Sequence, residues 1–114
     1  MVIFVDIDET ICHHSEGDPS QARDYAKGTP MVENINKINE LYDAGHTIVY
    51  WTARGCITGI DWTDITQQQL IEWGAKHHEL KMNKPHYDLF ICDKAINSNT
   101  FFMENGTNEP PRSW

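Results

Sequence analysis

The sequence contains no apolar run close to the about 20 residues that a membrane-spanning helix needs, which predicts a protein with no membrane partner. It has only three cysteines, Cys12, Cys56 and Cys92, and their spacing is unlike that of metal ligands, which favours free thiols and a cytoplasmic location. Basic residues are few: nine Lys and Arg stand against seventeen Asp and Glu, for a net charge of -8. This balance argues against nucleic acid as the main partner.

The composition is that of one globular domain. The chain has 114 residues, of which 39% are hydrophobic and 23% charged. This supplies enough apolar side chains for one core and too few residues for two domains. We expect a domain over residues 1–103 and a flexible tail over residues 104–114, which carries Asn, Gly and two prolines.

The first half of the chain predicts an α/β fold. Residues 2–7 are apolar at almost every position, as in a buried parallel strand, and residues 12–29 have no periodicity and predict a long loop. Apolar residues then recur at helical spacing from Pro30, with Thr29 as the expected N-cap, to Gly45 as the expected stop. A β-rich run over residues 46–52 follows, and strand, helix and strand in this order indicate a parallel sheet.

The second half continues the alternation of helices and strands. Residues 63–76 predict a second helix, residues 78–80 a short strand, and residues 87–92, Tyr-Asp-Leu-Phe-Ile-Cys, a further strand. Ligands of open parallel sheets bind at the carboxyl ends of the strands. Polar residues follow these expected strand ends or directly precede the last strand: Asp6, Asp8, Thr52, Lys84 and Asp93. We expect their side chains to converge at one edge of the sheet.

The segment Asp6-Ile7-Asp8-Glu9-Thr10 resembles the first motif, Asp-x-Asp-x-Thr, of the haloacid dehalogenase superfamily of phosphohydrolases. Thr52, Lys84 and Asp93 resemble its second, third and fourth motifs in the correct order. The resemblance implies a three-layer, Rossmann-like α/β fold with a small, mostly parallel sheet. The chain has no room between the motifs for a cap domain, so a capless member is expected. A narrower similarity, to small phosphatase-like proteins associated with sugar and capsule biosynthesis, rests on these segments: Trp51-Thr-Ala-Arg-Gly55, Asp61-Trp62, Gln69-Leu70, and Lys84-Pro85 with Asp93-Lys94-Ala95.

The resemblance also implies roles for these residues. Asp6 would attack phosphorus and bind Mg2+, and Asp8 would give its backbone carbonyl to the metal and serve as acid and base. Thr52 and Lys84 would hold the phosphoryl group, and Asp93 would complete the magnesium site. The related pattern commonly has two adjacent acids where this chain has Cys92 and Asp93.

The loop after Thr52 supplies the remaining substrate-binding candidates, Ala53 and Arg54, and Arg54 is suited either to clamp a second substrate group or to form an ion pair. The histidine pairs, His13-His14 and His77-His78, lack zinc-finger spacing, so we expect no zinc site, but His13 or His14 could contact substrate.

The sequence therefore predicts a Mg2+-dependent phosphomonoesterase acting on a small phosphorylated metabolite, a phosphosugar being one candidate. Two alternatives stay open: a phosphatase acting on nucleic-acid or protein phosphate ends, and a non-catalytic module that binds phosphate or metal. A capless site must be covered by a homo-oligomeric partner, by a large substrate, or not at all.

Overall fold

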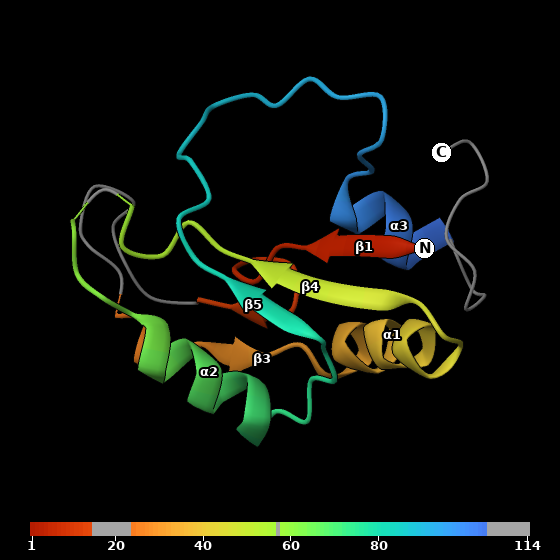
Figure 1. Ribbon diagram of the computed structural model, residues 1–114, viewed down its shortest axis with the longest axis horizontal. Helices are drawn as coiled ribbons and strands as arrows, with labels where there is room; N and C mark the ends of the chain where they lie inside the picture. Colours follow the sequence, from red (N-terminus) through yellow and green to blue (C-terminus); the bar gives the residue numbers. More distant parts are fainter. Residues whose placement is uncertain (15–23, 57, 105–114) are drawn as a thin grey trace.

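The computed structural model describes residues 1–14, 24–56 and 58–104. Its main sheet consists of three parallel strands in the order β1-β4-β5, namely β1 (Val2–Val5), β4 (Thr47–Trp51) and β5 (Glu79–Lys81) (Figure 1). Val5 pairs with Tyr50 across β1 and β4, so the two strands end at the same edge. The expected α/β class with a mostly parallel sheet is confirmed.

A small antiparallel pair lies where the sequence predicts a loop. β2 (Cys12–His13) pairs with β3 (Thr29–Pro30), and the 3-10 helix η1 (Tyr25–Lys27) directly precedes β3. The prediction of a loop over residues 12–29 is therefore wrong at both ends, and its middle, residues 15–23, lies outside the described residues. The pairing joins segments far apart in the chain, which local periodicity does not reveal.

Helix α1 (Val32–Asp43) connects β1 to β4 along the chain, and its buried side chains recur at helical spacing: Ile35, Ile38 and Leu41. The helix begins two residues after the expected Pro30, because Pro30 belongs to β3 and pairs with Cys12. Its end agrees with the prediction. Gly45 follows with a φ of 100°, a conformation that glycine adopts without steric cost.

Helix α2 (Thr63–Glu72) begins where expected and ends four residues before the expected Lys76. Gly74 follows it with a φ of 68°, which stops the helix. The buried face of α2 carries two polar residues beside one apolar residue: Thr66, Gln69 and Leu70.

The prediction of a strand over residues 87–92 is wrong. After β5 the chain turns at Asn83, with a φ of 67°, and passes Pro85, which has no N–H to give to a sheet. It then runs as an irregular arc away from the sheet to α3 (Ser98–Glu104) (Figure 1). Leu89 and Ile91 are 76% and 88% exposed. Apolar, β-branched composition favours a strand only where a neighbouring strand edge accepts it.

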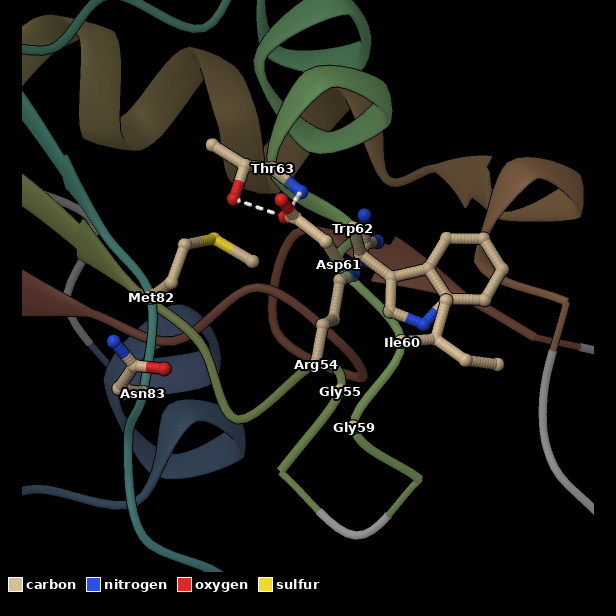
Figure 2. Close-up of a pocket in the computed structure, with 9 residues that line it drawn as sticks. All are labelled: Arg54, Gly55, Gly59, Ile60, Asp61, Trp62, Thr63, Met82 and Asn83. Atoms are coloured by element: carbon tan, nitrogen blue, oxygen red, sulfur yellow. Dashed lines mark hydrogen bonds between the residues drawn. The ribbon is translucent and has the colours of Figure 1, made fainter.

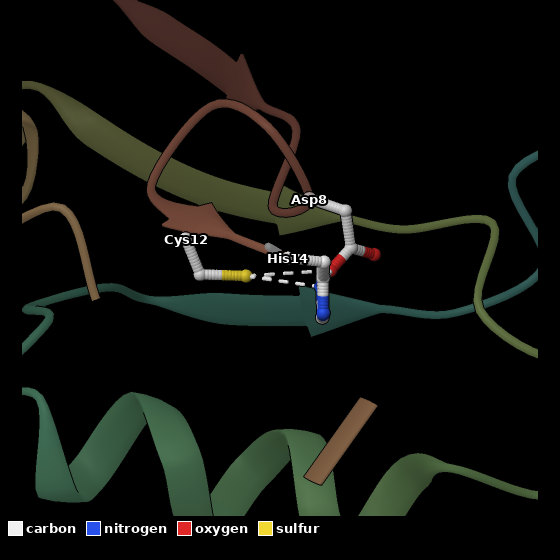
Figure 3. A group of neighbouring side chains, drawn as sticks. All are labelled: Asp8, Cys12 and His14. Atoms are coloured by element: carbon white, nitrogen blue, oxygen red, sulfur yellow. Dashed lines mark hydrogen bonds and ion pairs between the residues drawn. The ribbon is translucent and has the colours of Figure 1, made fainter. Parts of the chain in front are cut away.

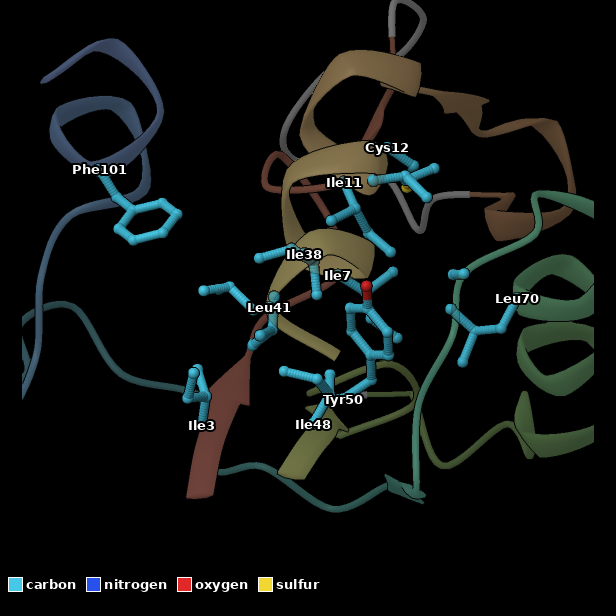
Figure 4. Close-up of a cluster of buried hydrophobic side chains, with 13 residues drawn as sticks. Ile3, Ile7, Ile11, Cys12, Ile38, Leu41, Ile48, Tyr50, Leu70 and Phe101 are labelled. Carbon is cyan, nitrogen blue, oxygen red and sulfur yellow. The ribbon is translucent and has the colours of Figure 1, made fainter. Parts of the chain in front are cut away.

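The core is one cluster of side chains from the sheet and the helices, in which Leu70 of α2 and Phe101 of α3 take opposite sides (Figure 4). The expected tail over residues 104–114 lies outside the described residues, except for Glu104, which ends α3. Among the described residues, no helix has both the length and the apolar character needed to cross a membrane.

Candidate active site

Two predicted site residues lie at the carboxyl-terminal edge of the sheet because of where β1 and β4 end. Asp6 directly follows β1, and Thr52 directly follows the parallel strand β4. Lys84 is tied to the same edge by its backbone N–H, which donates to the Thr52 carbonyl at 3.0 Å. The structure therefore brings Asp6, Thr52 and Lys84 together, the first two through the strand order and Lys84 through its backbone hydrogen bond.

Asp6 and Lys84 face each other in a cavity of about 240 Å³, which Ala53 also lines. The Lys84 Nζ lies 3.7 Å from Asp6 Oδ1, and the Asp6 side chain is 42% exposed. Burial raises the pKa of the Asp6 carboxyl above its ordinary value, and the nearby Lys84 ammonium only partly offsets this. The Lys84 ammonium also lies over the rings of Trp51 and Tyr87, at 5.8 and 5.6 Å. The cavity thus offers one reachable carboxylate beside one fixed cation.

Asp8 is presented by a tight loop after β1. The carbonyl of Ile7 accepts backbone N–H groups from Thr10, Ile11 and Cys12 at 3.1, 2.9 and 3.3 Å, and Glu9 has a φ of 62°. This winding turns the chain back on itself, so that the backbones of Asp8 and Cys12 pair as an isolated β-bridge. The Asp8 side chain is 17% exposed.

Arg54 is the centre of a buried polar network around Asp8. Its Nη2 lies 2.9 Å from Asp8 Oδ1, and its Nε lies 3.1 Å from Asp8 Oδ2. Its Nη1 donates to Thr66 Oγ1 at 3.0 Å and to Gln69 Oε1 at 2.5 Å. The ring of Tyr25 lies 4.8 Å from the guanidinium carbon. Arg54, expected among the substrate-binding residues, is fully buried and engaged by side chains of this chain.

This network sets the charge state of Asp8. Burial by itself raises the pKa of the Asp8 carboxyl, but hydrogen bonds and charge from Arg54, helped by His14 and Cys12, outweigh burial and lower the pKa. Asp8 is therefore held as a carboxylate. Asp6 and Asp8, two residues apart, have pKa shifts in opposite directions because only Asp8 is paired with a guanidinium.

Cys12 and His14 complete the surroundings of Asp8 (Figure 3). His14 Nε2 lies 2.7 Å from Asp8 Oδ1, and the Cys12 thiol donates to the same oxygen at 3.3 Å. The three side chains could together hold a metal ion, a grouping that the spacing of the cysteines and histidines does not predict. Arg54 Nη2 lies 3.6 Å from Cys12 Sγ, so a positive charge already lies against this group.

The structure does not bring Asp93 to Asp6. Asp93 is exposed on the irregular segment before α3, and its side chain contacts the neighbouring Cys92 at 3.9 Å. Among the described residues, Asp93 is not one of those that line the cavity beside Asp6. Thr52 lies at the expected edge but is fully buried, and its Oγ1 accepts the backbone N–H of Arg54 at 3.1 Å.

Sequence reasoning does not identify Thr66 and Gln69 as partners of Arg54. One signal could have found them: both are polar residues, three positions apart, on the helix face that also carries the buried Leu70. A polar pair on an inward helix face needs a buried partner, and Arg54 is that partner.

The fold has counterparts among solved structures. A protein from Vibrio cholerae, known from a crystal structure, is similar with a TM-score of 0.76 and 24% sequence identity, over 92% of this chain and 89% of that one. A chain of a Pnkp1/Rnl/Hen1 complex is similar with a TM-score of 0.58 and 16% identity, over 90% of this chain and 33% of that one. No family model matches the sequence, and no curated protein matches it significantly. At these identities the similarity shows the fold alone.

Proposed function

We propose that this protein is a Mg2+-dependent phosphomonoesterase of the haloacid dehalogenase type, acting in the cytoplasm on a small phosphorylated metabolite. The observation that carries the proposal is the pair of Asp6 and Lys84, whose Oδ1 and Nζ lie 3.7 Å apart in a cavity at the strand ends. A carboxylate attacks a phosphate dianion only where positive charge offsets the repulsion, and Lys84 supplies such a charge beside Asp6.

In the proposed reaction Asp6 is the nucleophile. A bond forms between its carboxylate oxygen and phosphorus, while the bond from phosphorus to the leaving oxygen breaks. The leaving oxygen takes a proton and departs as an alcohol. Water then attacks the aspartyl phosphate, gives up a proton, and releases inorganic phosphate with Asp6 restored. Lys84 balances the charge of the phosphoryl group in both steps.

Asp8 is the proposed proton donor and acceptor. Held as a carboxylate by Arg54, it is ready to accept a proton from the attacking water. In the first step a protonated Asp8 would deliver its proton to the leaving oxygen. The pairing with Arg54 disfavours this protonated form, so the general-acid role needs its own test with good and poor leaving groups. Arg54 is a positioning residue, because it touches Asp8 and orients its carboxylate.

Thr52 is the proposed donor to a phosphoryl oxygen. Its Oγ1 accepts the backbone N–H of Arg54, which leaves the hydroxyl hydrogen for another acceptor. Thr52 is fully buried, so this role requires access past Ala53. Thr52→Val keeps the shape and removes the hydroxyl. Weaker phosphate binding in this variant supports the role, and unchanged binding contradicts it.

We propose that Asp6, the backbone carbonyl of Asp8 and Asp93 hold the Mg2+ ion. Hard oxygen ligands suit Mg2+, which would neutralise phosphoryl charge when bound. Asp6 fits this role as a half-exposed carboxylate. Asp93 fits it only if the segment after Lys84, residues 85–97, takes another position while Lys84 stays beside Asp6. Asp93→Ala should then weaken Mg2+ binding about tenfold or more, as measured by calorimetry. Wild-type Mg2+ affinity in this variant removes Asp93 from the set.

A panel of phosphate esters, with and without Mg2+, tests the proposed function. We expect hydrolysis of sugar phosphates and aryl phosphates that depends on Mg2+, and a loss of at least about 10^4 in kcat for Asp6→Asn. The matched control, Asp88→Asn, changes an exposed acid and should keep wild-type turnover. Activity only on nucleic-acid or protein phosphates supports that alternative, and phosphate binding without turnover identifies a non-catalytic module.

A further inference from the structure

A second cavity, of about 350 Å³, is lined by residues of the segment after Thr52 and of the segment before Lys84 (Figure 2). On each of two segments of the chain, a residue that lines the first cavity is next to a residue that lines the second. Ala53 and Lys84 line the first cavity, and the next residues, Arg54 and Asn83, line the second. The two linings therefore meet at consecutive residues on both segments. The volume of the second cavity lies within the range of small-ligand pockets, about 300–1,000 Å³.

One wall of the second cavity is a turn that closes after Arg54. Gly59 donates its backbone N–H to the Gly55 carbonyl at 2.9 Å. Gly55 has a φ of 81°, and a Cβ at this position would lie 2.1 Å from the Ile60 carbonyl oxygen, so only glycine fits. The turn therefore has a conformation that requires glycine at position 55, and Asp61, which follows the turn, also lines the cavity. In Figure 2 the Asp61 carboxylate points toward Thr63, and the dashed lines mark its hydrogen bonds to that residue.

Asp61 determines the charge of this cavity. Both of its hydrogen bonds, from the Thr63 backbone N–H at 2.9 Å and the Thr63 hydroxyl at 2.6 Å, go to Oδ1. These bonds lower the pKa of the Asp61 carboxyl, so it is ionised at neutral pH. The cation on the lining, Arg54, is already paired with Asp8. Among the residues described as lining the cavity, no other is charged, which leaves the charge of Asp61 unbalanced.

We propose that this cavity takes the leaving group of the phosphate ester, and that Asp61 selects a neutral, hydroxyl-bearing leaving group over one that carries a second phosphate. The inference rests on the proposed function, because it names the substrate class of the same site. An ionised carboxylate accepts hydrogen bonds from sugar hydroxyls, whereas it repels a phosphate dianion a few ångströms away. Asn83 and Thr63 add further polar groups that can pair with hydroxyls.

The test compares glucose 1-phosphate with glucose 1,6-bisphosphate in the wild type and in Asp61→Asn. The Asn side chain keeps an oxygen that caps Thr63 and removes the charge. We expect the wild type to prefer the monophosphate by about tenfold in kcat/KM, and Asp61→Asn to reduce this preference to about twofold. The matched control is Asp64→Asn, which removes an exposed acid of α2 that does not line the cavity. It should keep the wild-type ratio.

Two further measurements separate this inference from the proposed function. Phenyl phosphate has an uncharged leaving group without hydroxyls, so its turnover should not change in Asp61→Asn. Calorimetric binding of the two glucose esters to the wild type and Asp61→Asn reports the preference of the cavity even if no ester is hydrolysed. Absence of all turnover then contradicts the proposed function alone. A ratio that is the same in the wild type and Asp61→Asn, in turnover or in binding, overturns the role of Asp61.

Discussion

Arg54 and Asp8, 46 residues apart in the chain, meet in a two-point ion pair, with Nη2 2.9 Å from Oδ1 and Nε 3.1 Å from Oδ2. The guanidinium is fully buried, and the carboxylate is 17% exposed. The pair joins the loop after β1 to the segment after β4. It therefore fixes the proposed acid and base of the reaction through a guanidinium that is fully engaged by side chains of this chain.

Removing Arg54 should destabilise the fold. Arg54→Met leaves Asp8 buried without its cation, and we expect a loss of about 3 kcal/mol in the free energy of unfolding. The double variant, Arg54→Met with Asp8→Asn, should lose less than the sum of the single variants, by about 1 kcal/mol or more. Urea denaturation measures these losses.

An exposed ion pair provides the control for this cycle. Lys76 Nζ lies 2.8 Å from Asp43 Oδ1, but both side chains are about half exposed. Lys76→Met should therefore cost at most about 1 kcal/mol. Strictly additive losses at Arg54 and Asp8 would show that the buried pair is not coupled.

The pair should also make stability depend on acid pH. The pKa of Asp8 is near 3.9 in the unfolded chain and lower in the folded protein, because Arg54 outweighs the effect of burial. Between these two values the unfolded state binds more protons, so the free energy of unfolding falls as the pH decreases. The stability difference between the wild type and Asp8→Asn should therefore shrink below about pH 4. Asp88→Asn, at an exposed position, should follow the wild type throughout.

Lys84 and Lys81 lie three residues apart and should differ in effect. Lys84→Ala should lower kcat/KM about 100-fold, because the ammonium at 3.7 Å from Asp6 contributes charge where the phosphoryl group reacts. Lys81 is about half exposed and pairs with Glu79 at 3.6 Å, so Lys81→Ala should leave the kinetics unchanged. Equal kinetics in the two variants would place the phosphoryl group elsewhere.

Asp8→Asn should distinguish leaving groups. A proton donor matters most for a sugar alkoxide, which leaves poorly, and little for an acidic phenol. We expect Asp8→Asn to damage turnover of a phosphosugar far more than that of an aryl phosphate, whereas Asp6→Asn should damage both alike. The measurement is the ratio of the losses in kcat/KM at saturating Mg2+. Equal losses in Asp8→Asn would assign Asp8 a structural role.

The three thiols should react at different rates. Burial and, to a smaller extent, the Asp8 carboxylate raise the pKa of the Cys12 thiol to about 12, although Arg54 opposes the shift. Cys12 therefore has almost no thiolate at neutral pH, whereas Cys56 and Cys92 are exposed. A thiol reagent should modify two cysteines quickly in the folded protein and the third only on unfolding. Rapid loss of all three thiols would contradict the buried position of Cys12.

The sequence by itself predicted most of the main elements, because they depend on local patterns. The helical spacing of Ile35, Ile38 and Leu41 and the stop at Gly45 determine α1, and the β-branched runs determine β1 and β4. The order of these elements also predicted that Asp6 and Thr52 follow neighbouring parallel strands.

Only the tertiary structure decided what surrounds these residues. Whether residues 87–92 form a strand depends on a partner edge, and their composition carries no information about one. The partners of Arg54 come from separate segments of the chain: Asp8, Thr66 and Gln69. A long, charged side chain in a sequence is compatible with solvent, substrate or a buried carboxylate. Folding decides among them, because a guanidinium removed from water must find compensating hydrogen bonds and negative charge wherever the packed chain supplies them.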